Sequence, residues 1–295
     1  MKITTHYAKR GLALSAAAAL TLGIAACTDD AADGDILTVC TSIPFDPFEM
    51  EEDGEVVGFD AAMMELLADR RDQELEWNDV DFDAISSGSA LNTGQCDIAA
   101  AALTITETRE ENMGMSDGYF RADQALVIPE DSDISTLEDL EGLEVAVQAG
   151  STGEEFASSI EDEHGFTPVA HRDMGNVQAA LSSGGADASL ADVSAWGSMI
   201  DRGDLDLEII EVIETEEYYG FAVALDNTEL LEEANAMLEE AFEDGTYADI
   251  YEEWIGEPFE GDEGFGSVDP IDDTDDEDAD DEDDAEEDDA DDSDE

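Results

Sequence analysis

The stretch CDIAAAALTITETREENMGMSDGYF, residues 96–120, decides how the rest of the chain is interpreted. Residues 96–103 are mostly small and apolar, which is typical of a buried strand. Arg109 follows shortly afterwards, in a chain of 295 residues whose formal net charge is −74. Because cations are so scarce in this sequence, an arginine at this place calls for a specific explanation.

The charge of the chain excludes some partners. It has 83 Asp and Glu residues against nine Lys and Arg, and no lysine follows Lys9. A nucleic-acid partner is not expected, because phosphates would be repelled by such a surface. The same charge opposes compaction at low ionic strength, and high salt relieves that repulsion. We therefore interpret the composition as adaptation to a saline environment rather than as an incidentally acidic surface.

Residues 1–26 are typical of an export signal, with a short basic segment and then an apolar run that ends in small residues. The ending IAAC, 24–27, resembles the bacterial lipobox, and this implies that Cys27 is lipidated and becomes the first mature residue. The alternative is an ordinary signal with an incidental cysteine. We expect an N-terminal linker over 27–35 and an exported protein that is lipid-anchored to the outer face of the cytoplasmic membrane.

Strand-like and helix-like segments alternate along residues 36–256, which favours an α/β fold with largely parallel sheets. Asp60 is predicted to cap a helix, and residues 227–256 are predicted to form a helical hairpin broken near Gly245. Beyond the hairpin the pattern stops. The last 25 residues, from Ile271, carry 19 acidic residues, so a disordered acidic tail is predicted over 257–295.

In this order, the segments resemble the amino-acid-binding receptors of ATP-driven importers, solute-binding protein family 3. The opening stretch contributes a strand followed by Thr-x-Thr-x-x-Arg and then Met-Ser-Asp-x-Tyr-Phe. Four further segments carry the resemblance: LTVCTSIPFDPFEMEEDGEVVGFDAAMMELLA (37–68), LEDLEGLEVAVQAGSTGEEF (137–156), GGADASLADVSA (184–195) and DGTYADIYEEWIG (244–256).

The resemblance implies a two-lobed, type II periplasmic-binding-protein-like fold. Each lobe is expected to be a mostly parallel sheet flanked by helices, and the chain is expected to cross between the lobes twice, at a hinge. Lobe 1 is predicted over 36–126 and again over 222–256, and lobe 2 over 127–221.

The resemblance also implies a ligand site between the lobes. Arg109 falls on the position that grips the α-carboxylate, where a planar guanidinium offers two parallel donors. Thr104 falls where a hydroxyl assists that carboxylate, and Asp192 where an acid accepts hydrogen bonds from the α-ammonium. Thr152 falls at a helix start that can present its backbone N–H. The other implied positions are Phe45 and Phe82, which would sandwich the ligand side chain, and Ser42, Ala102 and Gln148.

The residues by themselves leave other interpretations open. Phe45 and Phe82 fit core aromatics, and Thr104 fits a strand residue with a satisfied hydroxyl. Arg109 fits a surface ion pair, which would contribute little to stability. Asp192 fits a solvated surface carboxylate.

One departure from the family bears on the ligand. Family members often carry an aspartate at the place of Ser42, and its loss lowers the expectation of a lysine- or arginine-like ligand. Glu216 and Glu217 are the acids that can supply that charge instead.

Two cysteines remain after Cys27. An exported compartment permits disulfides, so Cys40 and Cys96 are predicted to pair, although spacing alone does not show that they meet. The three histidines are scattered, so neither a metal site nor a cofactor is expected.

The sequence thus favours a monomeric binding protein that delivers one amino acid to the permease subunits of an ABC importer. One alternative is a receptor for a zwitterionic compatible solute such as an ectoine. Another is an enzyme like the cyclohexadienyl dehydratases, which share this fold. An enzyme needs a positioned general acid or base, and the matched segments offer no lysine or histidine for that role, so no enzymatic activity is expected.

Overall fold

The computed structural model describes residues 36–203 and 205–259, together with Gly261, Gly266, Val268, Pro270 and Ile271. The predicted signal over 1–26, the predicted lipidation at Cys27 and the predicted linker over 27–35 lie outside the described residues. The residues from 272 onward, which make up most of the predicted acidic tail, lie outside them as well.

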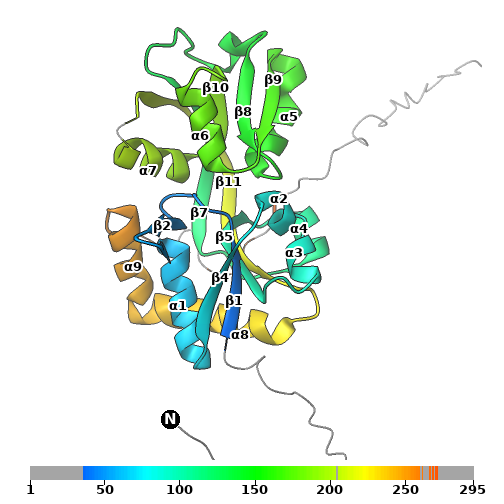
Figure 1. Ribbon diagram of the computed structural model, residues 1–295, viewed down its shortest axis with the longest axis vertical. Coiled ribbons are helices and arrows are strands. Elements are labelled where there is room, and N and C mark those ends of the chain that lie inside the picture. The colour runs from blue at the N-terminus through cyan, green and yellow to red at the C-terminus, as the bar shows by residue number, and fades with distance from the viewer. Residues whose placement is uncertain are drawn as a thin grey trace, which may run out of the picture. The chain divides into compact units, whose positions relative to one another are not determined.

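Within the described residues, nine strands form one continuous sheet in the order β4-β1-β5-β11-β7-β10-β8-β9, with β6 paired to β11. The strands are β1 (Ile36–Thr41), β4 (Glu74–Asp79), β5 (Ile98–Thr104), β6 (Gly114–Met115), β7 (Phe120–Pro129), β8 (Glu144–Gln148), β9 (Thr167–His171), β10 (Ala188–Asp192) and β11 (Leu207–Val223). Strands β4, β1 and β5 are mutually parallel, and so are β9, β8 and β10. The long strands β7 and β11 pair antiparallel between these two groups (Figure 1).

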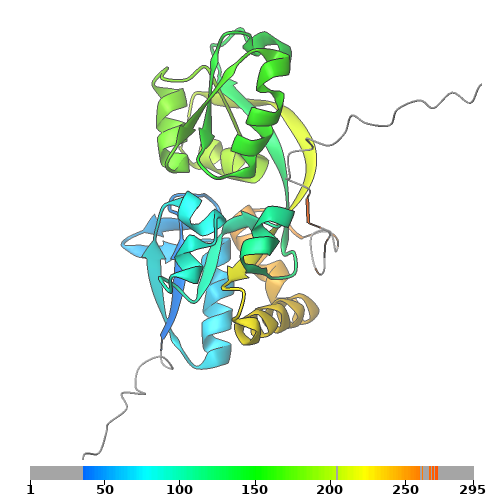
Figure 2. The same ribbon diagram turned by 90° about the vertical axis from the view of Figure 1, so that its right-hand side faces the viewer.

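Helices pack on both parallel groups. Helix α1 contacts β4 and β5 and lies beside α8 and α9, whereas α5 contacts β8, β9 and β10 (Figure 2). The helices are α1 (Phe59–Arg71), α2 (Phe82–Ser86), α3 (Ser89–Asn92), α4 (Glu107–Asn112), α5 (Thr152–His164), α6 (Met174–Ser182), α7 (Val193–Gly203), α8 (Thr228–Asp244) and α9 (Thr246–Ile255), with a 3-10 turn at Leu137–Leu140 and a hairpin of β2 (Met50–Glu52) and β3 (Glu55–Val57). Two parallel groups joined by two long strands agree with the predicted α/β fold. The residue boundaries predicted for the lobes stay a prediction.

The start of α1 differs from the prediction that Asp60 caps it. The helix begins directly after Gly58, whose φ is 135°, and a Cβ there would lie 2.1 Å from the Phe48 carbonyl oxygen. Asp60 is therefore already helical and fully buried. Its carboxylate accepts hydrogen bonds from the Ala102 amide at 2.9 Å and the Tyr119 hydroxyl at 2.7 Å. The carboxylate thus fixes a bend in β5, where Ala102 has a φ of 46°, instead of closing a helix end.

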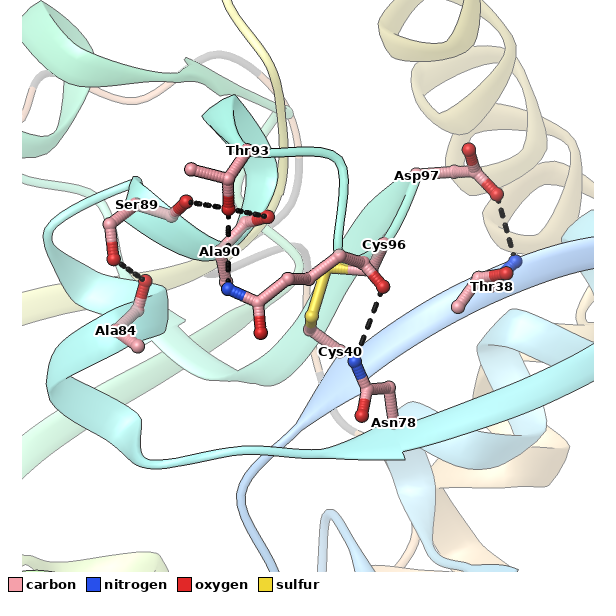
Figure 3. Close-up of a disulfide and its surroundings, with 10 residues drawn as sticks. Thr38, Cys40, Asn78, Ala84, Ser89, Ala90, Thr93, Cys96 and Asp97 are labelled. Carbon is pink, nitrogen blue, oxygen red and sulfur yellow. Dashed lines mark hydrogen bonds between the residues drawn. A yellow bond between two sulfur atoms is a disulfide. The ribbon is translucent and has the colours of Figure 1, made fainter.

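The predicted cysteine pair lies within the first parallel group, on its central strand β1 and just before β5. Cys40 in β1 and Cys96 just before β5 are joined in the structure, with Cα atoms 5.5 Å apart (Figure 3). Beside them the Thr38 amide donates a hydrogen bond of 2.9 Å to the Asp97 carboxylate. The Cys40–Cys96 disulfide therefore connects β1 to the start of β5, the strand that leads to Arg109.

The first residues after α9 differ from the prediction of a disordered tail that starts at residue 257. Phe259 packs against two tyrosines of α9, with ring centroids 5.0 and 5.2 Å apart. Gly266 exchanges main-chain hydrogen bonds of 2.8 and 3.0 Å with the loop before β7, and the Ile271 carbonyl accepts one of 3.0 Å from the Glu107 amide. Apolar side chains in this stretch have surface to bury, which the acidic residues beyond it lack.

Candidate functional site

Arg109 is buried at the junction of β5 and α4. The hydroxyl of Thr106 caps α4 by accepting a hydrogen bond of 3.2 Å from the Arg109 amide, and this places the arginine side chain over the end of β5. The guanidinium donates to the Thr104 carbonyl at 2.8 Å and to the Gly150 carbonyl at 3.0 Å. Only 3% of Arg109 is exposed, which excludes a surface ion pair as its role.

The two predicted ligand hydroxyls meet at a carboxylate of the protein itself. Thr104 ends β5 and Thr152 begins α5, and their hydroxyl oxygens lie 3.4 Å apart. Both donate to Oε2 of Glu217 in β11, at 3.0 and 2.6 Å. The structure therefore shows these hydroxyls arranged to hold a carboxylate group.

Asp192 lies at the carboxyl end of β10 and is only 8% exposed, so it is not a solvated surface acid. It accepts hydrogen bonds from the Tyr219 hydroxyl at 2.5 Å and from the Gln124 amide at 2.6 Å. Burial, followed by the nearby charge of Glu217, raises the pKa of Asp192 to about 7, although both hydrogen bonds and the charge of Arg109 act in the opposite direction.

Gln124 connects the two acids. Its side-chain nitrogen lies 2.6 Å from Asp192 Oδ1 and 3.0 Å from Glu217 Oε1, and it also lies 3.4 Å from the Thr152 hydroxyl. Its oxygen is buried and has no hydrogen-bond partner among the described residues. Gln124 thus shares one NH₂ group between the two carboxylates.

The predicted aromatic positions are both buried, and the structure gives each a partner in the protein. Phe82 lies 5.8 Å from the Arg109 guanidinium, measured to the ring centroid, within the range of a cation–π contact. Phe45 packs against Phe48 with centroids 6.1 Å apart. These contacts fit the core interpretation of both rings, and their contact with a ligand stays a prediction.

The remaining predicted positions lie at or near strand ends. Ser42 directly follows β1, Gln148 ends β8, and Ala102 is held in β5 by Asp60; all of them are buried. Carboxyl ends of strands are where ligands bind in open α/β sheets. Their roles in binding stay predictions.

The prediction of the site from the sequence missed Gln124 and Tyr219, and it named Glu217 only as a possible source of charge. Gln124 and Tyr219 carry no charge, and the residues around them do not mark them as part of a site. Glu217 is one of 83 acidic residues and is distinguished only by its place in β11, where the pairing with β7 shifts register between Ile213 and Glu217.

Two other features are absent from the part of the chain that the structure describes. No set of three or more His, Cys, Asp or Glu side chains there is arranged to hold a metal ion. None of the helices in this part combines the length and apolarity needed to span a bilayer.

Comparison with known proteins agrees with this geometry. The sequence model of the family described as "Bacterial extracellular solute-binding proteins, family 3" matches residues 37–257. ArtP of Bacillus subtilis (strain 168), an arginine-binding extracellular protein, is 30% identical over 84% of this chain and 98% of its own.

Similarity to solved structures identifies the fold. An ancestral arginine-binding protein bound to arginine is 36% identical, with a TM-score of 0.70 over 74% of this chain and 97% of that one. An ancestral arginine-binding protein bound to glutamine is 37% identical, with a TM-score of 0.69 over 75% and 98% of the two chains. The predicted two-lobed, type II periplasmic-binding-protein fold is thereby confirmed.

Proposed function

The chain belongs to the bacterial extracellular solute-binding proteins, family 3, and from this premise we propose that it is the receptor of an ABC importer for an amino acid. It binds the amino acid between its two lobes, closes at the hinge formed by β7 and β11, and delivers the ligand to the permease subunits. The relatives are named as binding proteins, and we propose that this chain likewise binds its ligand without chemical change.

One observation carries the proposal: a buried guanidinium and a buried acid belong to the same hydrogen-bonded network. Arg109 donates to the Thr104 carbonyl, the Thr104 hydroxyl donates to Glu217, and Gln124 connects Glu217 to Asp192. A free amino acid carries one carboxylate and one ammonium on neighbouring atoms. In our proposal Arg109 binds the α-carboxylate together with the Thr152 backbone N–H and with the Thr104 hydroxyl, which turns from Glu217 to the ligand, and Asp192 binds the α-ammonium.

The finer assignments also remain proposals. We propose lipid attachment at Cys27, a monomeric state, and lobes over 36–126 with 222–256 and over 127–221. We also propose that the acidic composition adapts the protein to high salt.

A thermal-shift screen of the mature protein tests the proposal. It would cover the free amino acids and ectoine at molar salt, since a ligand that binds only the folded state raises the melting temperature. We expect at least one amino acid to raise it and ectoine to leave it unchanged. A shift with ectoine alone would support the compatible-solute alternative and refute the amino-acid ligand.

Matched variants connect the shift to the site. Arg109→Lys should abolish most of the ligand-induced shift, whereas Arg202→Lys, at an arginine 41% exposed and paired with Glu52, should keep it. If the ligand raises the melting temperature of both variants equally, Arg109 does not take part in ligand binding.

A further inference from the structure

Glu217 is a buried acid that the proposed contacts with the α-carboxylate and the α-ammonium of the ligand do not use. Only 1% of the residue is exposed. Oε2 accepts hydrogen bonds from Thr104 and Thr152, at 3.0 and 2.6 Å. Oε1 accepts from Gln124 at 3.0 Å and from Thr215 at 2.8 Å. Four donors hold the carboxylate in one position beside the proposed α-amino and α-carboxylate subsites.

The charges of the network do not balance. Within the network as described, one guanidinium, Arg109, accompanies two carboxylates, Asp192 and Glu217, and all three residues are buried. A zwitterionic amino acid adds no net charge, so the closed site would bury one uncompensated negative charge. A buried charge that no opposite charge balances is costly even where it accepts hydrogen bonds. An amino acid with a cationic side chain brings one positive charge and makes the occupied site neutral.

The same imbalance favours the protonated form of Asp192. The charge of Glu217 is the second cause, after burial, that raises the pKa of Asp192 to about 7. A ligand that carries an extra positive charge can take over the role of that proton, whereas a neutral isostere leaves the two carboxylates with their mutual repulsion.

We propose that Glu217 is a specificity-determining residue, which makes the site selective for amino acids with a cationic side chain. Arginine is the ligand that tests this selectivity. The inference rests on the proposed function. It differs from the expectation drawn from Ser42, because it places the selecting charge on β11, one of the two proposed hinge strands, instead of at the end of β1.

A comparison of the affinities for arginine and citrulline tests the role of the ligand's side-chain charge. Citrulline has nearly the same shape as arginine and the same α-amino and α-carboxylate groups, but a neutral side chain. Isothermal titration calorimetry at pH 8 should give wild-type protein an affinity for arginine about tenfold or more above that for citrulline, as expected for the loss of one charged interaction. Glu217→Gln should reduce this ratio of affinities to within about threefold of unity, chiefly by lowering the affinity for arginine.

The neighbouring residue provides the control. Glu216 is exposed, so Glu216→Gln removes the same charge from the same strand and should leave the ratio as in wild type. Glu217→Asp keeps the charge and should keep a preference for arginine even if both ligands bind more weakly.

The outcomes are distinct. Equal wild-type affinities for arginine and citrulline would overturn the inference without any variant, so it stays testable even if Glu217→Gln fails to fold. Parallel losses of both ligands in Glu217→Gln would overturn it too, because they would assign Glu217 to the α-ammonium or to structure. Failure of wild-type protein to bind any amino acid would overturn the proposed function and the inference with it.

Discussion

Ligand affinity should depend on pH because Asp192 takes up a proton in the neutral pH range. Burial, and then the charge of Glu217, raises the pKa of Asp192 to about 7. A ligand ammonium beside this carboxylate favours its ionised form, so the pKa falls when the ligand binds and binding releases a proton. Below pH 7 the ligand must displace that proton, and affinity therefore falls as the pH falls. Above pH 7 Asp192 is already ionised and affinity should become constant.

The size of the effect follows from the pKa. Two pH units below it, about one site in a hundred is ionised, so affinity at pH 5 should be roughly 100-fold weaker than at pH 8. This corresponds to about 2.7 kcal/mol of binding free energy. Asp60 also titrates in this range, because burial raises its pKa to about 6. A variant is therefore needed to attribute the dependence to Asp192.

Calorimetric titration with arginine supplies the measurement. Titrations at pH 5, 6, 7 and 8, each in two buffers with different ionisation enthalpies, give the affinity and the number of protons released. We expect release of nearly one proton at pH 5, about half a proton at pH 7 and almost none at pH 8.

Asp192→Asn is the control for this titration. It should bind weakly and without this pH dependence, and its melting temperature without ligand should differ little from that of wild type. A wild-type affinity that stays constant from pH 5 to pH 8 would refute the reasoning. The same slope in Asp192→Asn would place the proton elsewhere, and a large loss of stability in that variant would assign Asp192 to structure.

Three further predictions concern the cation, the charge and the disulfide. Arg109→Lys should weaken binding by about 2 kcal/mol or more in calorimetry, and a loss of less than threefold in affinity would contradict a bidentate carboxylate contact. The melting temperature should rise steeply from low to molar salt both in the full chain and after truncation behind Ile271, a boundary that keeps Phe259; a flat curve for the truncated protein would assign the salt response to the tail. Thiol titration of denatured, unreduced mature protein should find neither Cys40 nor Cys96 free, and two reactive thiols would exclude the bond.

The strands and the central motif could be predicted because their residue patterns are local. Small apolar residues over 98–103 leave room for close neighbours on both sides, and all of them are buried. Arg109 stood out because cations are rare in this chain. The scarcity of cations thus marked Arg109 as a candidate site residue. Acidic residues are abundant in this chain, so no single one could be assigned a role in the same way.

The errors arose where long-range contacts decide. A carboxylate near a helix start usually caps it, but Asp60 turns inward to Ala102 and Tyr119, which are distant in sequence. Composition marked the tail correctly as acidic, but it does not show that Phe259 reaches the tyrosines of α9. Glu217 required knowledge of which strands are neighbours, because its donors come from β5, β7 and α5 as well as from its own strand.

As the proposed ligand site, the buried network would also explain how a chain of this charge can select its ligand. A chain with 83 acidic residues attracts every cation, and at molar salt the screening length is about 3 Å, so the charge exposed on its surface discriminates poorly there. Buried charges are screened much less. Selection by Arg109, Asp192 and Glu217 should therefore change little between low and molar salt, while stability changes strongly. If the preference for arginine over citrulline instead disappears at molar salt, surface attraction and not the buried network sets the choice of ligand.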